Sequence, residues 1–260
     1  MSLMVRAFGS FSARVAFDLV SRRPYAFGVL EGAQIAKRFG YSGRLLALEF
    51  GVAGGDGLFN LARIAKEASA ITGQDIQVVG FDSGQGLPAS LDYRDHPELY
   101  KAGDYPPIDK DRLIAALPAN CKLIYGDIAE TALPFLSSLE DTAVSFVSID
   151  VDYYSSATDC LRAIGGATRE ALLPYLPIYF DDTLKPSHCS WAGERLSVRE
   201  FNEQNPMRKI EPYTGLRGRR IMKRARWIDQ MYALHTLDHP LRTVVAANNV
   251  DIKKLSNRYL

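Results

Sequence analysis

The chain has 260 residues, enough for one large domain or for one domain with appendages. Its 47% hydrophobic and 23% charged residues are ordinary for a globular protein, and a formal net charge of +1 gives no reason to expect nucleic acid or an anionic membrane as a partner. Cys121, Cys160 and Cys189 form no CxxC pair, so the sequence predicts neither a zinc site nor a disulfide framework and fits a reducing, cytoplasmic setting.

Residues 1–42 are expected to form a helical extension. Five apolar residues recur there at helical spacing: Met4, Phe8, Phe11, Val15 and Leu19. Charged residues interrupt this run, so it predicts neither a signal peptide nor a membrane span of about 20 residues. We expect an amphipathic helix that packs on its own domain or on a partner subunit, followed by a second helix over 24–39. With the tail described below, this suggests a homo-oligomer.

Short apolar runs then alternate with helix-like segments over 43–224, the expected core. Strands are predicted at 44–50, 76–82, 122–125, 143–149 and 178–180, helices at 57–70, 155–173 and 192–204, and an antiparallel edge hairpin within 208–223. This alternation predicts an α/β fold with a parallel sheet and helices on both faces. The stretch 88–110 is rich in Pro, Asp and Tyr, which is typical of a lid, a binding loop or a disordered segment.

A glycine-rich turn follows the first predicted strand. Its glycines, Gly51, Gly54, Gly55 and Gly57, allow a ligand to approach the backbone at the start of a helix. Their spacing, GxxGGxG, misses the GxGxxG pattern that grips a dinucleotide pyrophosphate. Glu49 would repel a pyrophosphate but would attract the ammonium group of a methionine-like moiety. An ordinary strand-to-helix turn is the alternative interpretation.

Two further aspartates follow the next two strands. Asp82 ends the second strand, where it is placed to accept hydrogen bonds from both hydroxyls of a ribose. Asp127 follows the third strand, and its proposed partner is an adenine amine. Either residue could instead be a helix cap or turn residue. Because the carboxyl ends of parallel strands share one edge of a sheet, both aspartates and the glycine turn together predict an adenosyl site.

Four more carboxylates follow the fourth and fifth strands: Asp150, Asp152, Asp181 and Asp182. Adjacent buried carboxylates repel one another, and a divalent cation such as Mg²⁺ would relieve that cost with oxygen ligands. The sequence therefore predicts a metal site here. Capping, or ion pairs with Lys185 or Arg195, is the alternative.

Four motifs together resemble those of the macrocin O-methyltransferase family. They are LEFGVAGGDGL (48–58), GFDSGQGLP (80–88), DVDYYS (150–155) and FDD (180–182), within a similarity that spans about 24–205. The resemblance, to an uncharacterised branch, implies a Rossmann-like class I methyltransferase with a seven-stranded, mostly parallel sheet whose last strand is antiparallel. Residues 225–260 lie outside the resemblance and are expected to form a C-terminal tail.

The resemblance also implies the chemistry of the site. Members transfer a methyl group from S-adenosylmethionine to a sugar hydroxyl with magnesium. Carried over, the metal ligands are Asp150, Asp181 and Asp182, and the candidate base is Asp150 or Asp152. Ser83, in the second motif, joins the cofactor-binding residues. The expected acceptor is a small molecule bearing a hydroxyl.

Two other functions remain open. The basic run over 217–226 carries six cations in ten residues, which would suit an RNA methyltransferase, although a charged edge strand explains it as well. A non-catalytic adenosyl-binding protein would need the glycine turn but not the paired carboxylates. The neutral net charge favours no nucleic-acid partner.

Overall fold

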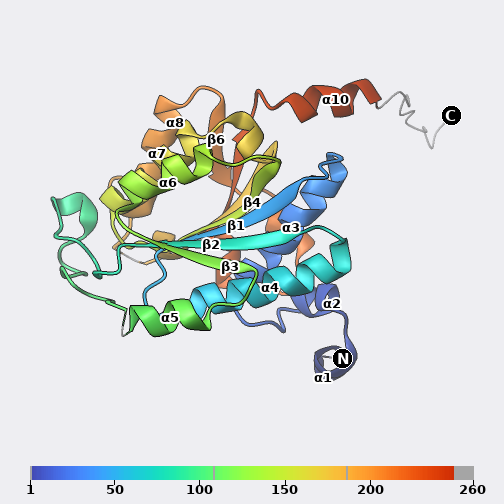
Figure 1. Ribbon diagram of the computed structural model, residues 1–260, viewed down its shortest axis with the longest axis horizontal. Helices are drawn as coiled ribbons and strands as arrows, with labels where there is room; N and C mark the ends of the chain where they lie inside the picture. The colour runs from blue at the N-terminus through green and yellow to red at the C-terminus, as the bar shows by residue number, and fades with distance from the viewer. Residues whose placement is uncertain (1, 108, 186, 249–260) are drawn as a thin grey trace.

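A computed structural model describes residues 2–107, 109–185 and 187–248. Within these ranges the chain forms a seven-stranded sheet of order β3-β2-β1-β4-β5-β7-β6 (Figure 1). The strands are β1 (Arg44–Phe50), β2 (Ile76–Asp82), β3 (Cys121–Tyr125), β4 (Thr142–Ile149), β5 (Tyr175–Phe180), β6 (Arg208–Pro212) and β7 (Met231–Thr236). The order is doubly wound, because the chain moves outward from β1 to β3 and then returns to continue from β4.

The five strands β1–β5 are parallel to one another. Every residue of β1 after Arg44 is buried, as expected for a central parallel strand covered on both faces. Strand β7 runs antiparallel to both β5 and β6. The predicted α/β fold, including an antiparallel last strand in the chain, is confirmed.

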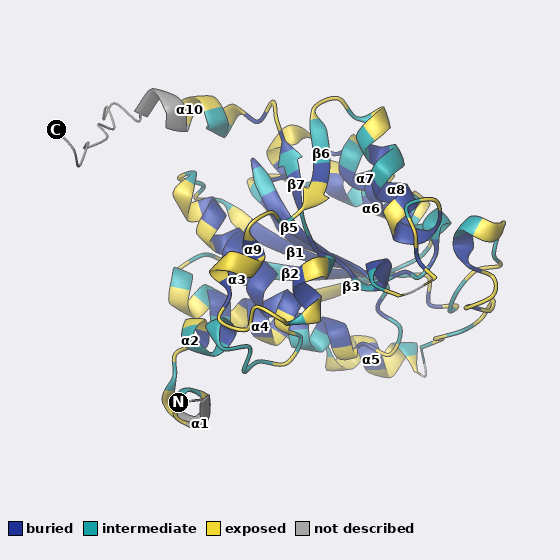
Figure 2. Cartoon of the chain, turned by 180° about the vertical axis from the view of Figure 1, so that it is seen from behind, coloured by how far each residue is buried: buried dark blue, intermediate teal, exposed yellow. Residues whose placement is uncertain are grey.

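Helices cover both faces of the sheet. Helices α3 and α4 contact one face, whereas α6, α7 and α8 form a layer on the other (Figure 1). Figure 2 shows that the buried residues gather on the strands and on the helix faces turned toward them. The helices are α1 (Ser2–Phe8), α2 (Phe11–Ala16), α3 (Arg23–Arg38), α4 (Asp56–Thr72), α5 (Lys110–Ala116), α6 (Ile128–Ser137), α7 (Tyr154–Gly166), α8 (Gly193–Gln204), α9 (Leu216–Arg219) and α10 (Pro240–Asn248), with short 3-10 turns η1 (Tyr93–Asp95), η2 (Arg169–Ala171), η3 (Asp181–Thr183) and η4 (Arg226–Gln230).

The end of the chain differs from the sequence prediction. The expected hairpin within 208–223 is wrong, because β6 pairs with β7, and α9 and η4 lie between the two strands. Strand β7 belongs to the stretch expected to be a tail, yet it lies between β5 and β6 in the sheet. The boundary expected at residue 224 therefore cuts through the sheet.

The beginning of the chain also differs in detail. Instead of one amphipathic helix, α1 and α2 are separate and meet near Gly9. Phe11 and Val15 of α2 are buried in the core, whereas Met4 and Phe8 of α1 are exposed. Helix α3 lies in the expected extension but packs on β4 and β5. No helix among the described residues combines the length and the apolar character needed to cross a membrane.

Candidate active site

A cavity of about 930 Å³ opens at the carboxyl edge of the sheet. It lies where ligands bind in open α/β sheets. Ten of the residues predicted from the sequence line it: Glu49, Gly51, Gly54, Gly57, Asp82, Ser83, Asp127, Asp150, Asp152 and Asp181. Of the other two, Gly55 belongs to the glycine turn and Asp182 lies buried beside Asp181. Residues scattered over the sequence thus converge on one site.

The glycine turn is shaped by close approach of other groups. A Cβ on Gly51 would strike the backbone carbonyl of Asp150, and a Cβ on Gly57 would strike the carboxylate of Glu49. Gly55 has a φ of 88°, a left-handed conformation that favours glycine, and α4 begins directly after it. The turn therefore fixes the first turn of α4 beside the cavity and leaves room for the Glu49 carboxylate.

Glu49 is the buried carboxylate at the base of this turn. Tyr25 of α3 donates a hydrogen bond from its hydroxyl to Glu49 Oε1 at 2.7 Å, and Ser148 of β4 donates to the Tyr25 hydroxyl at 3.0 Å. Oε2 has no hydrogen-bond partner among the described residues. Burial raises the pKa of Glu49 to about 8, against the opposing effect of the Tyr25 hydrogen bond. A buried carboxylate oxygen without a partner, next to a cavity, suits a cationic ligand group.

Asp82 joins the glycine turn to the segment that follows β2. Its Oδ2 accepts backbone hydrogen bonds from Val52 and Ala53, each at 2.8 Å, and its Oδ1 accepts one from Gly84 at 2.6 Å. Next to it, the hydroxyl of Ser83 donates to the Gly86 carbonyl at 3.1 Å. Asp82 thus holds two loops of the cavity wall together, and one acceptor position on Oδ1 remains for the predicted ribose contact.

Asp127 caps the helix that follows β3. Its Oδ1 accepts a hydrogen bond from the backbone of Ala129 at 2.9 Å, at the start of α6. The helix-cap alternative is therefore realised in the structure. Because the side chain is exposed and lines the cavity, its predicted contact with an adenine amine stays a prediction.

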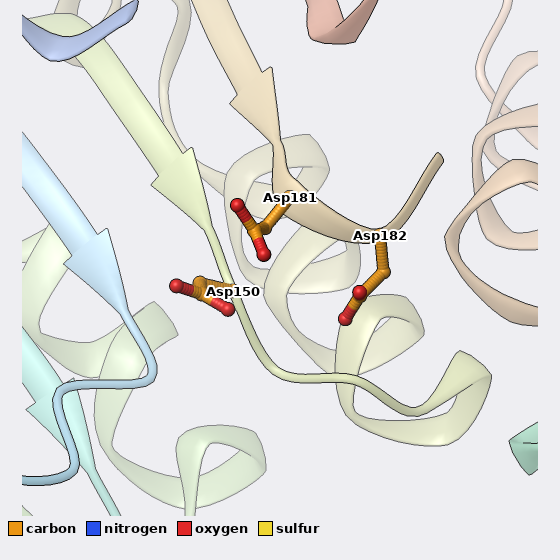
Figure 3. A group of neighbouring side chains, drawn as sticks. All are labelled: Asp150, Asp181 and Asp182. Carbon is orange, nitrogen blue, oxygen red and sulfur yellow. The ribbon is translucent and has the colours of Figure 1, made fainter. Parts of the chain in front are cut away.

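Three carboxylates meet at the ends of β4 and β5. Asp150, Asp181 and Asp182 each place one oxygen within 4.8 Å of the others, and Figure 3 shows how they project from the two neighbouring strand ends. The pKa of Asp150 is raised mainly by burial and further by repulsion from Asp181. The pKa of Asp152 is raised to about 7, mainly by burial and further by repulsion from Asp182. Full ionisation of the cluster is therefore unfavourable unless a cation compensates the charge.

One lysine partly neutralises this cluster. Lys185 forms an ion pair with Asp182, and its ammonium lies 3.9 Å from Asp152. The alternative of ion pairing is thus realised for these two carboxylates. Arg195 instead donates to the hydroxyl of Ser190. Neither Asp150 nor Asp181 forms an ion pair within the described part of the chain, so these two carboxylates lack a neutralising cation.

Glu194 is a further acid that sequence reasoning missed. It is completely buried in the first turn of α8, and its Oε2 accepts a hydrogen bond from the backbone of Asp182 at 2.9 Å. Its other oxygen, Oε1, has no partner among the described residues. The pKa of Glu194 is raised mainly by burial and further by the negative charge of Asp182. No motif distinguishes this residue from the solvated acids common in the first turn of a helix.

The segment 84–107 forms part of the cavity wall. Figure 1 shows it projecting beyond the carboxyl edge. Its buried Asp95 accepts hydrogen bonds from the backbone of Leu91 at 2.9 Å and from that of Ser155, in the first turn of α7, at 2.8 Å. Leu87, Leu91 and Tyr105 of this segment line the cavity. The predicted lid or binding loop is thus an ordered wall anchored to α7.

Left-handed backbone conformations gather around the cavity. Four lining residues other than glycine have positive φ: Arg22 (48°), Ala53 (46°), Tyr105 (60°) and Asp152 (60°). Such conformations cost on the order of 1 kcal/mol or more each and cluster at functional sites. Arg22 lines the cavity and is a second residue of the site that sequence reasoning missed, because a lone arginine between two helices belongs to no motif.

The donor sets fit the two groups expected from the sequence. The oxygen of Glu49 that lacks a partner suits an ammonium group, and the glycine turn leaves the backbone accessible beside it. The carboxylate cluster offers only hard oxygen donors, and Asp182 Oδ2 has no hydrogen-bond partner among the described residues. Hard oxygen donors suit Mg²⁺ or another hard divalent cation.

Two solved structures share this architecture. CalS11, a calicheamicin methyltransferase, is 19% identical, with 90% of this chain and 89% of CalS11 covered at a TM-score of 0.52. The O-methyltransferase NovP is 16% identical, with 70% of this chain and 72% of NovP covered at a TM-score of 0.50. The chain has the class I methyltransferase fold. No family model matches the sequence, and no curated protein matches it either.

Ion pairs within the chain account for half of the cations in the basic run at 217–226. Three of its six cations form ion pairs within the chain, with Arg217 bound to Asp229, Arg219 to Glu31 and Arg220 to Asp18. The pairs formed by Arg219 and Arg220 each include a buried carboxylate. These arginines hold the segment between β6 and β7 on the body of the protein, which disfavours the RNA-binding interpretation.

Proposed function

We propose that the chain is an S-adenosylmethionine-dependent methyltransferase that acts on a hydroxyl of a small molecule. The observation that carries the proposal is the convergence of the glycine turn, Glu49 and the carboxylate cluster on one cavity of a methyltransferase fold. A bound donor would leave its activated methyl group between the turn and the cluster. The protein then has to align the donor carbon with the acceptor oxygen and remove a proton.

The donor would lie along the glycine turn. We propose that Glu49 binds its ammonium, that Asp82 and Ser83 contact its ribose, and that Asp127 contacts its adenine. The hydrogen bonds that Asp82 already makes to the turn would fix the ribose contact relative to Glu49. Such a fixed arrangement lowers the entropic cost of aligning the two reactants.

The acceptor hydroxyl would lie beside the carboxylate cluster. We propose that Asp150, Asp181 and Asp182 hold Mg²⁺, which when bound would lower the pKa of the acceptor hydroxyl. Asp152 is the proposed base, and its carboxylate would receive the hydroxyl proton.

The remaining cavity wall indicates what kind of acceptor fits. Ser155, Ser156 and Asp159 of α7 offer polar groups, whereas Leu87 and Leu91 offer apolar ones. This mixture suits a polyhydroxylated molecule with an apolar portion, such as a sugar or a sugar-bearing natural product. The proposal agrees with the resemblance to the macrocin family and with the calicheamicin methyltransferase among the structural neighbours. We also propose that the protein acts in the cytoplasm as a homo-oligomer.

Methyl transfer tests this proposal. The wild type and Asp181→Asn are incubated with labelled S-adenosylmethionine and pooled hydroxylated metabolites, with Mg²⁺ or with a chelator. We expect Mg²⁺-dependent labelling by the wild type and at least about a 100-fold loss in the variant, because the substitution removes a ligand charge from the cluster. Donor binding should remain nearly unchanged, because Asp181 is not among the proposed donor contacts.

Asp111→Asn is the matched control. Asp111 is an exposed aspartate of α5 outside the cavity, so this variant should keep the wild-type rate. Labelling that survives the chelator and the Asp181→Asn substitution would contradict the metal site. Equal loss of donor binding and methyl transfer in a folded Asp181→Asn variant would count against the division of roles between the two halves of the cavity.

A further inference from the structure

Arg22 is a cation at the end of the cavity where Glu49 lies, the proposed site of the donor's amino-acid end. It lies between α2 and α3, is half-buried and lines the same cavity as Glu49. Its guanidinium carbon lies 5.6 Å from the centre of the Tyr25 ring, and the hydroxyl of that tyrosine donates to Glu49. Arg22 and Glu49 therefore place a cationic and an acidic side chain at the same end of the cavity.

The backbone fixes the direction of this side chain. Arg22 has φ 48° and directly precedes α3, whose second residue is Pro24. The preceding segment is held by Asp18, whose carboxylate pairs with the buried Arg220 and accepts a hydrogen bond from the Trp227 indole at 3.2 Å. The left-handed backbone conformation of Arg22 is thus supported by contacts between Asp18 and residues about 200 positions later in the chain.

The ion pair that Arg22 makes within the protein is weak and incomplete. One guanidinium nitrogen, Nη2, lies 3.2 Å from Asp56 Oδ2, and the Asp56 side chain is 82% exposed. An ion pair in such an exposed position is screened by solvent and contributes little to stability. A guanidinium has five N–H donors in a planar fork, so most of them remain available for a planar anion such as a carboxylate.

We infer that Arg22 binds the carboxylate at the amino-acid end of the methyl donor, while Glu49 binds its ammonium. This inference rests on the proposed function. The amino-acid end of S-adenosylmethionine carries one cation and one anion, and this end of the cavity supplies one anion and one cation that match them. Arg22 is therefore a residue that determines specificity for the complete donor and for its demethylated product.

Binding of two ligands distinguishes a direct contact of Arg22 with the donor carboxylate from a purely structural role of Arg22. S-adenosylhomocysteine contains the amino-acid end, whereas methylthioadenosine has the same adenine, ribose and thioether but lacks that end. We expect the wild type to bind S-adenosylhomocysteine more tightly. In Arg22→Gln, binding of S-adenosylhomocysteine should weaken by about 10- to 100-fold, the range for a lost charge-assisted hydrogen bond, with methylthioadenosine affinity changed less than about 3-fold.

The neighbouring arginine provides the control. Arg23 is exposed, donates to the Asp18 carbonyl at 3.1 Å and does not line the cavity. Arg23→Gln should therefore bind both ligands like the wild type. Arg22→Lys keeps the charge but loses the planar fork, so it should show an intermediate loss for S-adenosylhomocysteine alone, and it serves as the test variant if Arg22→Gln does not fold.

Calorimetric titration of the full chain with each ligand distinguishes the outcomes. Unchanged binding of S-adenosylhomocysteine by both Arg22 variants would overturn the inference, and so would an equal loss of both ligands in a folded variant. A wild type that binds neither ligand would instead reject the proposed function. The two failures are thus separate results of one experiment.

Discussion

Glu49 illustrates what a residue two positions before a glycine turn does in this fold. The sequence predicts an acid facing a cationic ligand group, and the structure adds the reason that it is available. Tyr25 donates a hydrogen bond to only one carboxylate oxygen of Glu49, and burial raises the pKa of Glu49 to about 8. Glu49 is therefore protonated near neutral pH without a ligand, and a neighbouring ammonium would favour its ionised form.

This shifted pKa predicts how stability depends on pH. The pKa of Glu49 is about 8 in the folded protein and 4.5 for an ordinary glutamate, so the folded state binds more protons between these values. The stabilising contribution of the protonated form is complete below pH 4.5 and is lost as pH rises through 8. Glu49→Gln should therefore resemble the wild type near pH 4.5 and be more stable near pH 8.5.

The expected gain at pH 8.5 is on the order of 2 to 5 kcal/mol, which urea denaturation of the ligand-free protein at several pH values would measure. Glu130→Gln, at an exposed position of α6, should show no such trend. A stability difference between Glu49→Gln and the wild type that stays constant over this pH range would contradict a raised pKa.

Not every residue of the site could be predicted from the sequence. The glycines and the aspartates after the strands share a local pattern, and parallel strands bring them to one edge. Arg22, Tyr25 and Glu194 reach the site from helices and linkers whose positions depend on tertiary packing. Their environment is set by contacts with residues far along the chain, such as the one between Tyr25 and Glu49, and local sequence carries no sign of these contacts.

At the scale of elements, the predicted strands agree closely with the structure. Strands β1 and β2 have the predicted bounds, because buried parallel strands appear as short apolar runs that end in glycine or aspartate. The predicted helix over 155–173 instead ends at Gly166, where two glycines weaken the helix, and a 3-10 turn follows. Helices α5 and α6 are short and were not predicted.

The wall formed by 84–107 depends on one buried carboxylate. Asp95 accepts one backbone hydrogen bond from within this segment and one from α7. Asp95→Asn replaces one acceptor oxygen with a donor, so one of these N–H groups loses its partner at a cost of about 1 to 3 kcal/mol. We expect amide hydrogen exchange in this segment to become at least several-fold faster while the strands remain protected.

Asp92→Asn is the control within the same segment. Asp92 caps η1 and pairs with Arg94, and among the described residues it makes no hydrogen bond beyond this segment. Its substitution should change exchange near η1 only. Equal exchange over 84–107 in Asp95→Asn and the wild type would show that Asp95 does not anchor the wall.

At the scale of the whole molecule, the sheet closes with the last part of the chain. Strand β7 lies between β5 and β6, although the sequence assigns its residues to a tail. The prediction failed because β6 and β7 are separated by 18 residues that include the basic run, and a hairpin prediction assumes a short turn. Arg219 and Arg220 then hold this connection on the body of the protein.

A substitution in β7 tests this arrangement. Leu234 is fully buried in β7, so Leu234→Ala should lower the free energy of unfolding by about 2 to 5 kcal/mol. Val244→Ala, at a residue of α10 that is 50% exposed, should cost less than about 1 kcal/mol. Denaturant unfolding measures both, and equal effects of the two substitutions would contradict the central position of β7.

The central claim is that the cavity is built for a methyl donor rather than a dinucleotide. Glu49 and the acidic cluster disfavour a pyrophosphate, whereas the glycine turn alone would permit either ligand. The most direct test is calorimetric titration of the full chain with S-adenosylmethionine and, separately, with NAD. We predict saturable binding of S-adenosylmethionine with a dissociation constant in the micromolar range and at least about 100-fold weaker binding of NAD. Tighter binding of NAD, or no binding of S-adenosylmethionine to the folded chain, would contradict this account.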